Sequence, residues 1–98
     1  MDIEYKTNKL KKVCTNAYEA QRAYGANMAE KIHQRIDEIK AADSVEFMIK
    51  NNIGRCHTLK QNREGLYAVD LVHPYRMIFR KINNELQIVK IEDILDYH

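Results

Sequence analysis

The hydrophobic period of this chain changes once, close to residue 53, and that change constrains the fold more than any other feature. Before it, Met28, Ile32, Ile36 and Ile39 recur about once per helical turn, which predicts an amphipathic helix. After it, apolar and polar residues alternate, as they do in strands with one buried face. Helices followed by a run of strands predict the α+β class, with the helices packed on one face of a sheet.

The first half of the chain predicts a helical hairpin. Helical spacing begins at Asn8, a plausible N-cap, and Gly25 separates this first stretch from the second, ANMAEKIHQRIDEIKAA. Asp43 or Ser44 could cap one more short helix through Phe47. The segment IEY near the start could form a short edge strand.

The second half predicts an antiparallel sheet. Four segments have strand character: CHTLK, LYAVDLV, YRMIFRKI and LQIVKI. Asn83-Asn84 is a hairpin turn signal between the last two. We therefore expect the helical hairpin to pack on a twisted, mainly antiparallel sheet of about four strands. The helical stripe should lie against Val69, Leu71, Met77 and Phe79. The opposite face of the sheet should stay exposed and carry basic side chains.

Length and composition predict one soluble domain spanning residues 1–98. The hydrophobic fraction of 45% argues against disorder. The apolar runs are too short to span a membrane, and the N-terminal segment lacks the apolar core of a signal peptide, so we expect a cytoplasmic protein. Cys14 and Cys56 lack metal-ligand spacing, which favours two buried free thiols over a disulfide or a metal site. We expect no metal and no cofactor.

Charge is distributed unevenly along the chain. Residues 49–81 contain seven Lys or Arg against two Asp or Glu, whereas residues 82–98 contain one basic and four acidic residues. A basic block in the middle of the chain is consistent with a polyanionic partner. A solvated strand face without a partner explains the same charges equally well.

Three polar groups close the chain, in the motif Asp96-Tyr97-His98. Chain ends usually fray, so such groups are useful only if the terminus is held in place. The last predicted strand runs directly into this motif, and pairing within a sheet would hold it.

Three sequence blocks carry a resemblance. HTLKQNREGLYAV, HPYRMIF and EDILDYH resemble, in order and spacing, the HigB group of the RelE/ParE superfamily of bacterial toxins. Members commonly show His-Pro-Leu-Lys-Gly-Asp/Asn-Arg-x-Gly, then an aromatic residue followed by Arg, and often end in Asp-Tyr-His. The sequence departs from this pattern at Thr58, where Pro is usual, and at Gln61, where Gly is usual. Neither position carries a functional side chain in the family.

The resemblance implies the toxin of a type II toxin–antitoxin system that acts as a ribosome-dependent mRNA endonuclease. Its catalytic side chains would fall on His57, Arg76, Asp96, Tyr97 and His98. It also implies a HigA-like helix-turn-helix antitoxin as partner, the ribosome and mRNA as targets, and contact with operator DNA only through the antitoxin. Lys60, Arg63 and Arg80 are then best interpreted as contacts to the RNA backbone.

These residue types suit RNA cleavage without a metal. The 2′-OH must lose its proton and attack the adjacent phosphate, and the leaving 5′ oxygen must gain a proton. Histidine suits such transfers because its pKa lies near ambient pH, and Arg76 could clamp two phosphate oxygens. Tyr97 could stack on a base or donate a proton, and Asp96 could fix a histidine tautomer or accept a proton.

Each of these residues also has an ordinary structural interpretation. A single strand histidine such as His57 is more often structural, and an exposed Arg76 is more often solvated. His73 precedes Pro74 and would shape a turn, and His33 would face solvent between helix-face positions. Tyr18, Tyr24 and Met28 would pack between helix and sheet.

Two other function classes remain open. ParE-like members of the same superfamily inhibit DNA gyrase and have no nuclease activity. They lack the histidine and the terminal Asp-Tyr-His motif that this sequence contains. A small domain that binds nucleic acid without catalysis is the third possibility.

Overall fold

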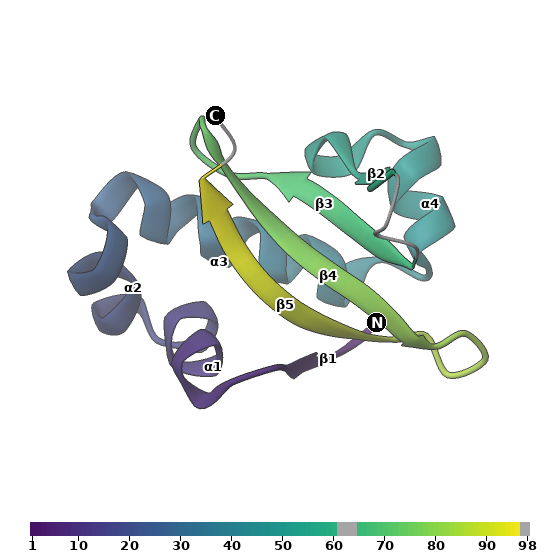
Figure 1. Ribbon diagram of the computed structural model, residues 1–98, viewed down its shortest axis with the longest axis horizontal. Coiled ribbons are helices and arrows are strands. Elements are labelled where there is room, and N and C mark those ends of the chain that lie inside the picture. The colour runs from purple at the N-terminus through teal and green to yellow at the C-terminus, as the bar shows by residue number, and fades with distance from the viewer. Residues whose placement is uncertain (61–64, 97–98) are drawn as a thin grey trace.

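The α+β architecture expected from the sequence is confirmed. The computed structural model describes residues 1–60 and 65–96, in which four helices and a 3₁₀ turn accompany a five-stranded sheet (Figure 1). The helices are α1 (Asn8–Thr15), α2 (Ala17–Tyr24), α3 (Ala26–Ala41) and α4 (Val45–Lys50), and the 3₁₀ turn is η1 (Ile53–Arg55). The strands are β1 (Asp2–Tyr5), β2 (His57–Thr58), β3 (Leu66–Asp70), β4 (Tyr75–Asn83) and β5 (Ile88–Asp96). In this described part of the chain, no helix is long and apolar enough to cross a membrane.

The sheet has the strand order β1-β5-β4-β3-β2. The parallel pair is β1 with β5, and the other neighbours are antiparallel. The expected strand count of about four is therefore one too low for the described residues. Both edge strands are short, with four residues in β1 and two in β2. The additional strand is β1, which the sequence offered only as a possible edge strand at IEY, because four residues show little alternation.

The first helical stretch is broken, unlike the continuous helix that its spacing predicts. Asn16 has extended backbone angles between α1 and α2, and its Oδ1 accepts a hydrogen bond from the Glu19 amide at 3.1 Å. Asn16 thus acts as the N-cap of a new helix. At the start of α1 the capping residue is Thr7, whose Oγ1 accepts from the Leu10 amide at 3.1 Å, and not Asn8.

Two other predicted helix boundaries are confirmed. Gly25 separates α2 from α3 with a φ of 86°, a backbone conformation that favours glycine. Ser44 caps α4, since its side-chain oxygen accepts from the Phe47 amide at 3.0 Å.

The core lies between α3 and one face of the sheet, and α3 runs behind the strands in Figure 1. All eight residues predicted to meet there are buried in one cluster: Met28, Ile32, Ile36, Ile39, Val69, Leu71, Met77 and Phe79. Tyr67 stacks on Phe79 with ring centroids 5.6 Å apart. Tyr24 packs edge-on against Tyr75, as expected of a helix–sheet contact.

Two residues were placed wrongly by the sequence. Tyr18 does not pack between helix and sheet: it is 68% exposed, and the Arg22 guanidinium lies over its ring. His33 is half-buried and not solvent-facing, because its Nε2 donates a hydrogen bond to the Val13 carbonyl of α1 at 3.0 Å. That bond ties α1 to α3 across the hairpin.

The opposite face of the sheet is less exposed than expected. Arg76 and Arg80 lie on it and are half-buried, but Ala68 and Ile78, which face each other across β3 and β4, are buried. Neither belongs to the helix-side core. Arg76 and Arg80 therefore lie on either side of a small buried apolar contact between Ala68 and Ile78.

Arg35 connects α3 to the end of β3 and passes the 3₁₀ turn η1. Its Nε donates to the Asp70 backbone carbonyl at 2.7 Å, and its Nη1 pairs with Glu38 at 2.8 Å. On the way it passes Gly54 of η1, where a β-carbon would lie 2.7 Å from Nε. The absence of a side chain at Gly54 thus lets η1 and the end of β3 lie side by side.

The α3 stripe should dominate stability. Replacing fully buried Ile32 with Ala leaves a cavity and should lower the free energy of unfolding by ~2–5 kcal/mol in urea or guanidinium titrations. Glu30→Ala on the exposed side of the same helix is the matched control and should change it by less than ~0.5 kcal/mol. Equal effects of the two substitutions would contradict this core.

Gly54→Ala should displace Arg35. The new β-carbon clashes with the Arg35 side chain, and φ of +58° is itself unfavourable for alanine, so we expect a loss of ~1–3 kcal/mol. The Arg35 Nε–H signal in NMR spectra should shift as its bond to Asp70 is lost. Gly25→Ala is the control: it has a φ of +86°, but a β-carbon there meets nothing within 4 Å. An unmoved Arg35 signal in Gly54→Ala would contradict the contact.

Candidate functional site

His57 and Arg76 line the same hollow at the β2 edge of the sheet. The hollow measures about 310 Å³, and its other lining residues are Asn52, Arg55 and Cys56. His57 comes from β2 and Arg76 from β4, with β3 between them. In the register of the sheet both share a face with Ala68 and Ile78, away from α3. The fold therefore brings together two of the predicted site residues that are far apart in sequence.

The orientation of the His57 ring follows from one hydrogen bond. Its Nδ1 lies 2.8 Å from the carbonyl oxygen of Arg55. A carbonyl can only accept, so Nδ1 carries the proton. In the neutral ring Nε2 then holds the lone pair and can accept a proton from a substrate.

Asp70 contacts two arginines at this hollow, and sequence analysis missed it. Its Oδ2 accepts from Arg55 Nε at 2.5 Å, and its Oδ1 lies 3.6 Å from Arg76 Nε. The hydrogen bond with Asp70 raises the pKa of Arg55. A second hollow, of about 60 Å³, has Arg55, Asp70 and Arg76 among its lining residues. The two arginines thus line both hollows and share one carboxylate, and Asp70 itself lines the smaller hollow.

Cys56 lines the hollow at His57, but its thiol is not a nucleophile there. Both cysteines are free and buried, as the sequence predicts. Burial raises the pKa of the Cys56 thiol to about 12. At neutral pH the sulfur is protonated, and a protonated thiol is a poor nucleophile.

The remaining predicted residues fall into three groups. Asp96 ends β5 opposite Tyr75 and does not line the hollow, although its neighbour Leu95 pairs with Arg76. Lys60 is exposed, and Arg80 is half-buried on β4 opposite Leu66. Tyr97, His98 and Arg63 lie outside the described residues, so the structure leaves their predicted roles untested.

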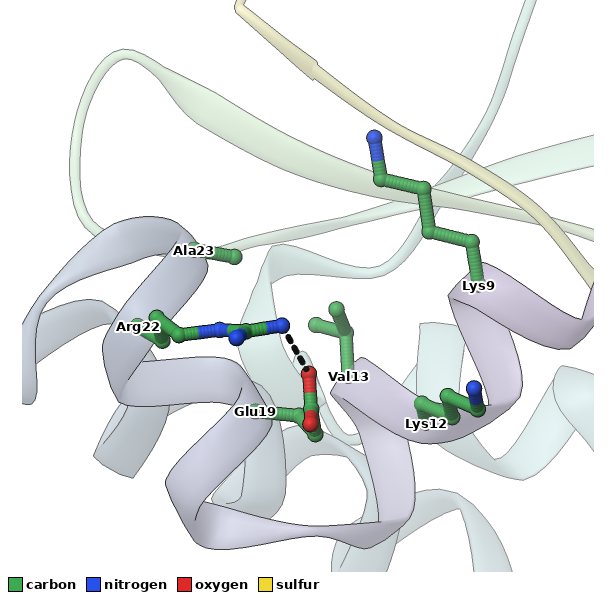
Figure 2. A pocket seen from close by; sticks show the side chains of 6 residues that line it. All are labelled: Lys9, Lys12, Val13, Glu19, Arg22 and Ala23. Atoms are coloured by element: carbon green, nitrogen blue, oxygen red, sulfur yellow. Dashed lines mark hydrogen bonds and ion pairs between the residues drawn. The ribbon is translucent and has the colours of Figure 1, made fainter.

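A larger hollow lies elsewhere, between α1 and α2. It measures about 390 Å³ and is lined by Lys9, Lys12, Val13, Glu19, Arg22 and Ala23. Figure 2 shows the Arg22 guanidinium directed at Glu19, with which it forms an ion pair of 3.1 Å. Among the described residues, this lining contains no histidine or cysteine, and its one carboxylate is paired with Arg22. Although smaller, the hollow at His57 has the chemistry that a reaction would need.

Sequence comparisons give no family. No protein-family model matches the chain, and no curated protein sequence matches it.

Structural comparisons do find relatives of the fold. A YoeB/ParE toxin from Agrobacterium tumefaciens superposes with a TM-score of 0.66 at 18% identity, covering 100% of both chains. YoeB from Staphylococcus aureus in a YoeB-YefM complex gives 0.65 at 20% identity, and the YoeB dimer from that organism gives 0.64 at 21%. Each covers 100% of this chain and 97% of the other. This chain therefore has the fold of YoeB/ParE toxins over its whole length.

Proposed function

We propose that this protein is the toxin of a type II toxin–antitoxin pair, a RelE/ParE-superfamily member of the HigB type, and that it cleaves mRNA on the ribosome. The observation that carries the proposal is the convergence of His57 and Arg76 on one hollow, with His57 Nε2 left to accept a proton. The toxin fold and the sequence blocks around both residues support it.

The proposed reaction uses the chain's own side chains. His57 Nε2 accepts the 2′-OH proton as the 2′ oxygen forms a bond to the adjacent phosphorus. The bond from phosphorus to the 5′ oxygen breaks, which leaves a 2′,3′-cyclic phosphate and a 5′-OH. Arg76 stabilises the extra negative charge on the phosphorane. Tyr97 or His98 supplies the proton to the leaving oxygen, and Asp96 orients one of these groups.

The ribosome has a physical role in this proposal. The net charge is only +2, and the basic residues of the exposed face surround buried Ala68 and Ile78. Such a surface neutralises few phosphates and therefore binds free RNA weakly. Lys60, Arg63 and Arg80 would add contacts to the backbone of an mRNA that the ribosome already holds in place. The protein would then act in the cytoplasm.

An antitoxin partner belongs to the same proposal. One of the structures with this fold is a complex of YoeB with YefM, which supports a protein partner here. We propose a HigA-like helix-turn-helix protein, through which the pair would contact operator DNA.

Cleavage should depend on the ribosome and on both residues of the hollow. Purified protein should cut translated mRNA within codons and in frame, and cut naked RNA poorly at physiological salt. His57→Gln and Arg76→Lys should each lower the rate by ~10²-fold or more while the thermal midpoint stays unchanged. Arg22→Lys, on exposed α2, is the matched control. Intact mRNA together with inhibition of DNA gyrase would instead indicate a ParE-like toxin. RNA binding without cleavage would indicate a non-catalytic nucleic-acid-binding domain.

The terminal motif should matter for rate and not for stability. Tyr97→Phe removes the phenol and His98→Gln removes the titrating ring, and both keep most of the volume. At least one should slow cleavage by ~10²-fold or more, with an unchanged thermal midpoint and unchanged antitoxin binding. Tyr18→Phe is the control, because Tyr18 is 68% exposed on α2. Near-wild-type cleavage by both terminal variants would remove the motif from catalysis.

A further inference from the structure

Asp70 contacts two arginines that line the hollow at His57. It pairs directly with Arg76 across β3 and β4, and its carboxylate also reaches Arg55 of η1. One negative charge thus lies between two positive ones that line the same hollow as His57. Two guanidinium groups brought this close would repel each other without it.

The carboxylate is not needed to hold the strand end in place. The backbone of Asp70 is fixed independently, because its carbonyl accepts from Arg35 at 2.7 Å. The next residue, Leu71, donates its amide to the Tyr75 carbonyl at 3.0 Å in the turn between β3 and β4. The Asp70 side chain is therefore available for a role toward the two arginines.

The two contacts of this carboxylate are unequal. Arg55 donates a hydrogen bond to Oδ2 through Nε, which leaves its two Nη groups as donors, and its side chain is 64% exposed. Oδ1 is buried and accepts no hydrogen bond from a described residue, while Arg76 Nε stands 3.6 Å away. A small movement of Arg76 toward Oδ1 would complete that hydrogen bond and fix the direction of its guanidinium.

We propose that Asp70 is a positioning residue that holds Arg55 and Arg76 as a pair, and that Arg55 is a second ligand of the RNA phosphate at this site. The proposal deepens the nuclease function and rests on it. A single guanidinium already donates to two phosphate oxygens, and a second one adds another positive charge and further N–H donors to the same phosphodiester. In this arrangement Asp70 does not touch the substrate but sets the orientation of the groups that do.

Asp70→Asn should lower the cleavage rate without weakening RNA binding. Asparagine keeps the shape and removes the negative charge beside the arginines. Binding of a 2′-O-methylated RNA oligonucleotide, which lacks the nucleophile, should stay equal or tighten at low salt. Single-turnover cleavage of ribosome-bound mRNA should fall tenfold or more, and Asp70→Glu should restore part of it. Asp37→Asn, on the exposed side of α3, is the control and should change neither RNA binding nor the cleavage rate.

Arg55→Gln tests the second ligand. It should weaken binding of the same oligonucleotide about tenfold and reduce the slope of log affinity against log salt by about 0.7. Arg22→Gln, which removes an exposed arginine from α2, should leave both quantities near wild type.

Three results would overturn the inference. The first is a cleavage rate of Asp70→Asn within twofold of wild type. The second is a parallel decrease in RNA affinity, cleavage rate and thermal midpoint in the same variant. The third is an Arg55→Gln variant whose slope of log affinity against log salt equals that of wild type. If the wild-type protein leaves ribosome-bound mRNA intact, the proposed nuclease function itself is contradicted. The binding measurements with Arg55→Gln would still decide whether Arg55 is a phosphate ligand.

Discussion

Burial of the α3 stripe against the sheet is the interaction on which the rest of the structure depends. Ile32, Ile39 and Phe79 are each 0% exposed, and they join residues from α1, α4 and β5 in a single cluster. The hydrophobic effect depends on the apolar area buried and not on the orientation of particular groups. It therefore decides which face of the sheet the helix covers, but it does not set the arrangement of polar side chains on the other face. That division leaves the opposite face, with His57 and Arg76, available for a polar site.

Arg35 links the core to that site. It is on α3 beside the buried stripe, only 12% of its side chain is exposed, and it bonds to the end of β3. The bond reaches the sheet at Asp70, the residue whose carboxylate then faces Arg55 and Arg76. A guanidinium with so little exposure that donates to a backbone carbonyl favours the observed position of that carbonyl, since loss of the donor would leave it without this partner. The backbone of Asp70 is therefore held in part by a side chain from the helix side of the protein.

The sequence predicted the parts of this structure that local patterns encode. Apolar spacing identified α3 and the long strands. The blocks that resemble the HigB group predicted a site at His57 and Arg76, and the structure shows that these two residues line one hollow. It did not predict the break at Asn16, because an asparagine at that spacing is equally compatible with a continuing helix until its side chain caps the next one. Nor did it predict Asp70: in LYAVDLV it reads as an ordinary outward-facing strand residue. Its partners lie 15 residues upstream at Arg55 and across a strand pair at Arg76, and only the folded register brings the three together.

The chain also shows why its fold and its chemistry must be argued separately. At 18–21% identity to YoeB/ParE toxins the whole fold is kept, since a fold of this kind requires apolar residues at the right period and competent caps, which many sequences provide. The site depends on far fewer side chains and on their orientation. Replacing Asp70 with an isosteric amide would leave every core contact intact and still change the charge between two arginines by one unit. The proposed activity would thus be decided at the face that the core leaves uncovered, by side chains that lie outside the helix-side core.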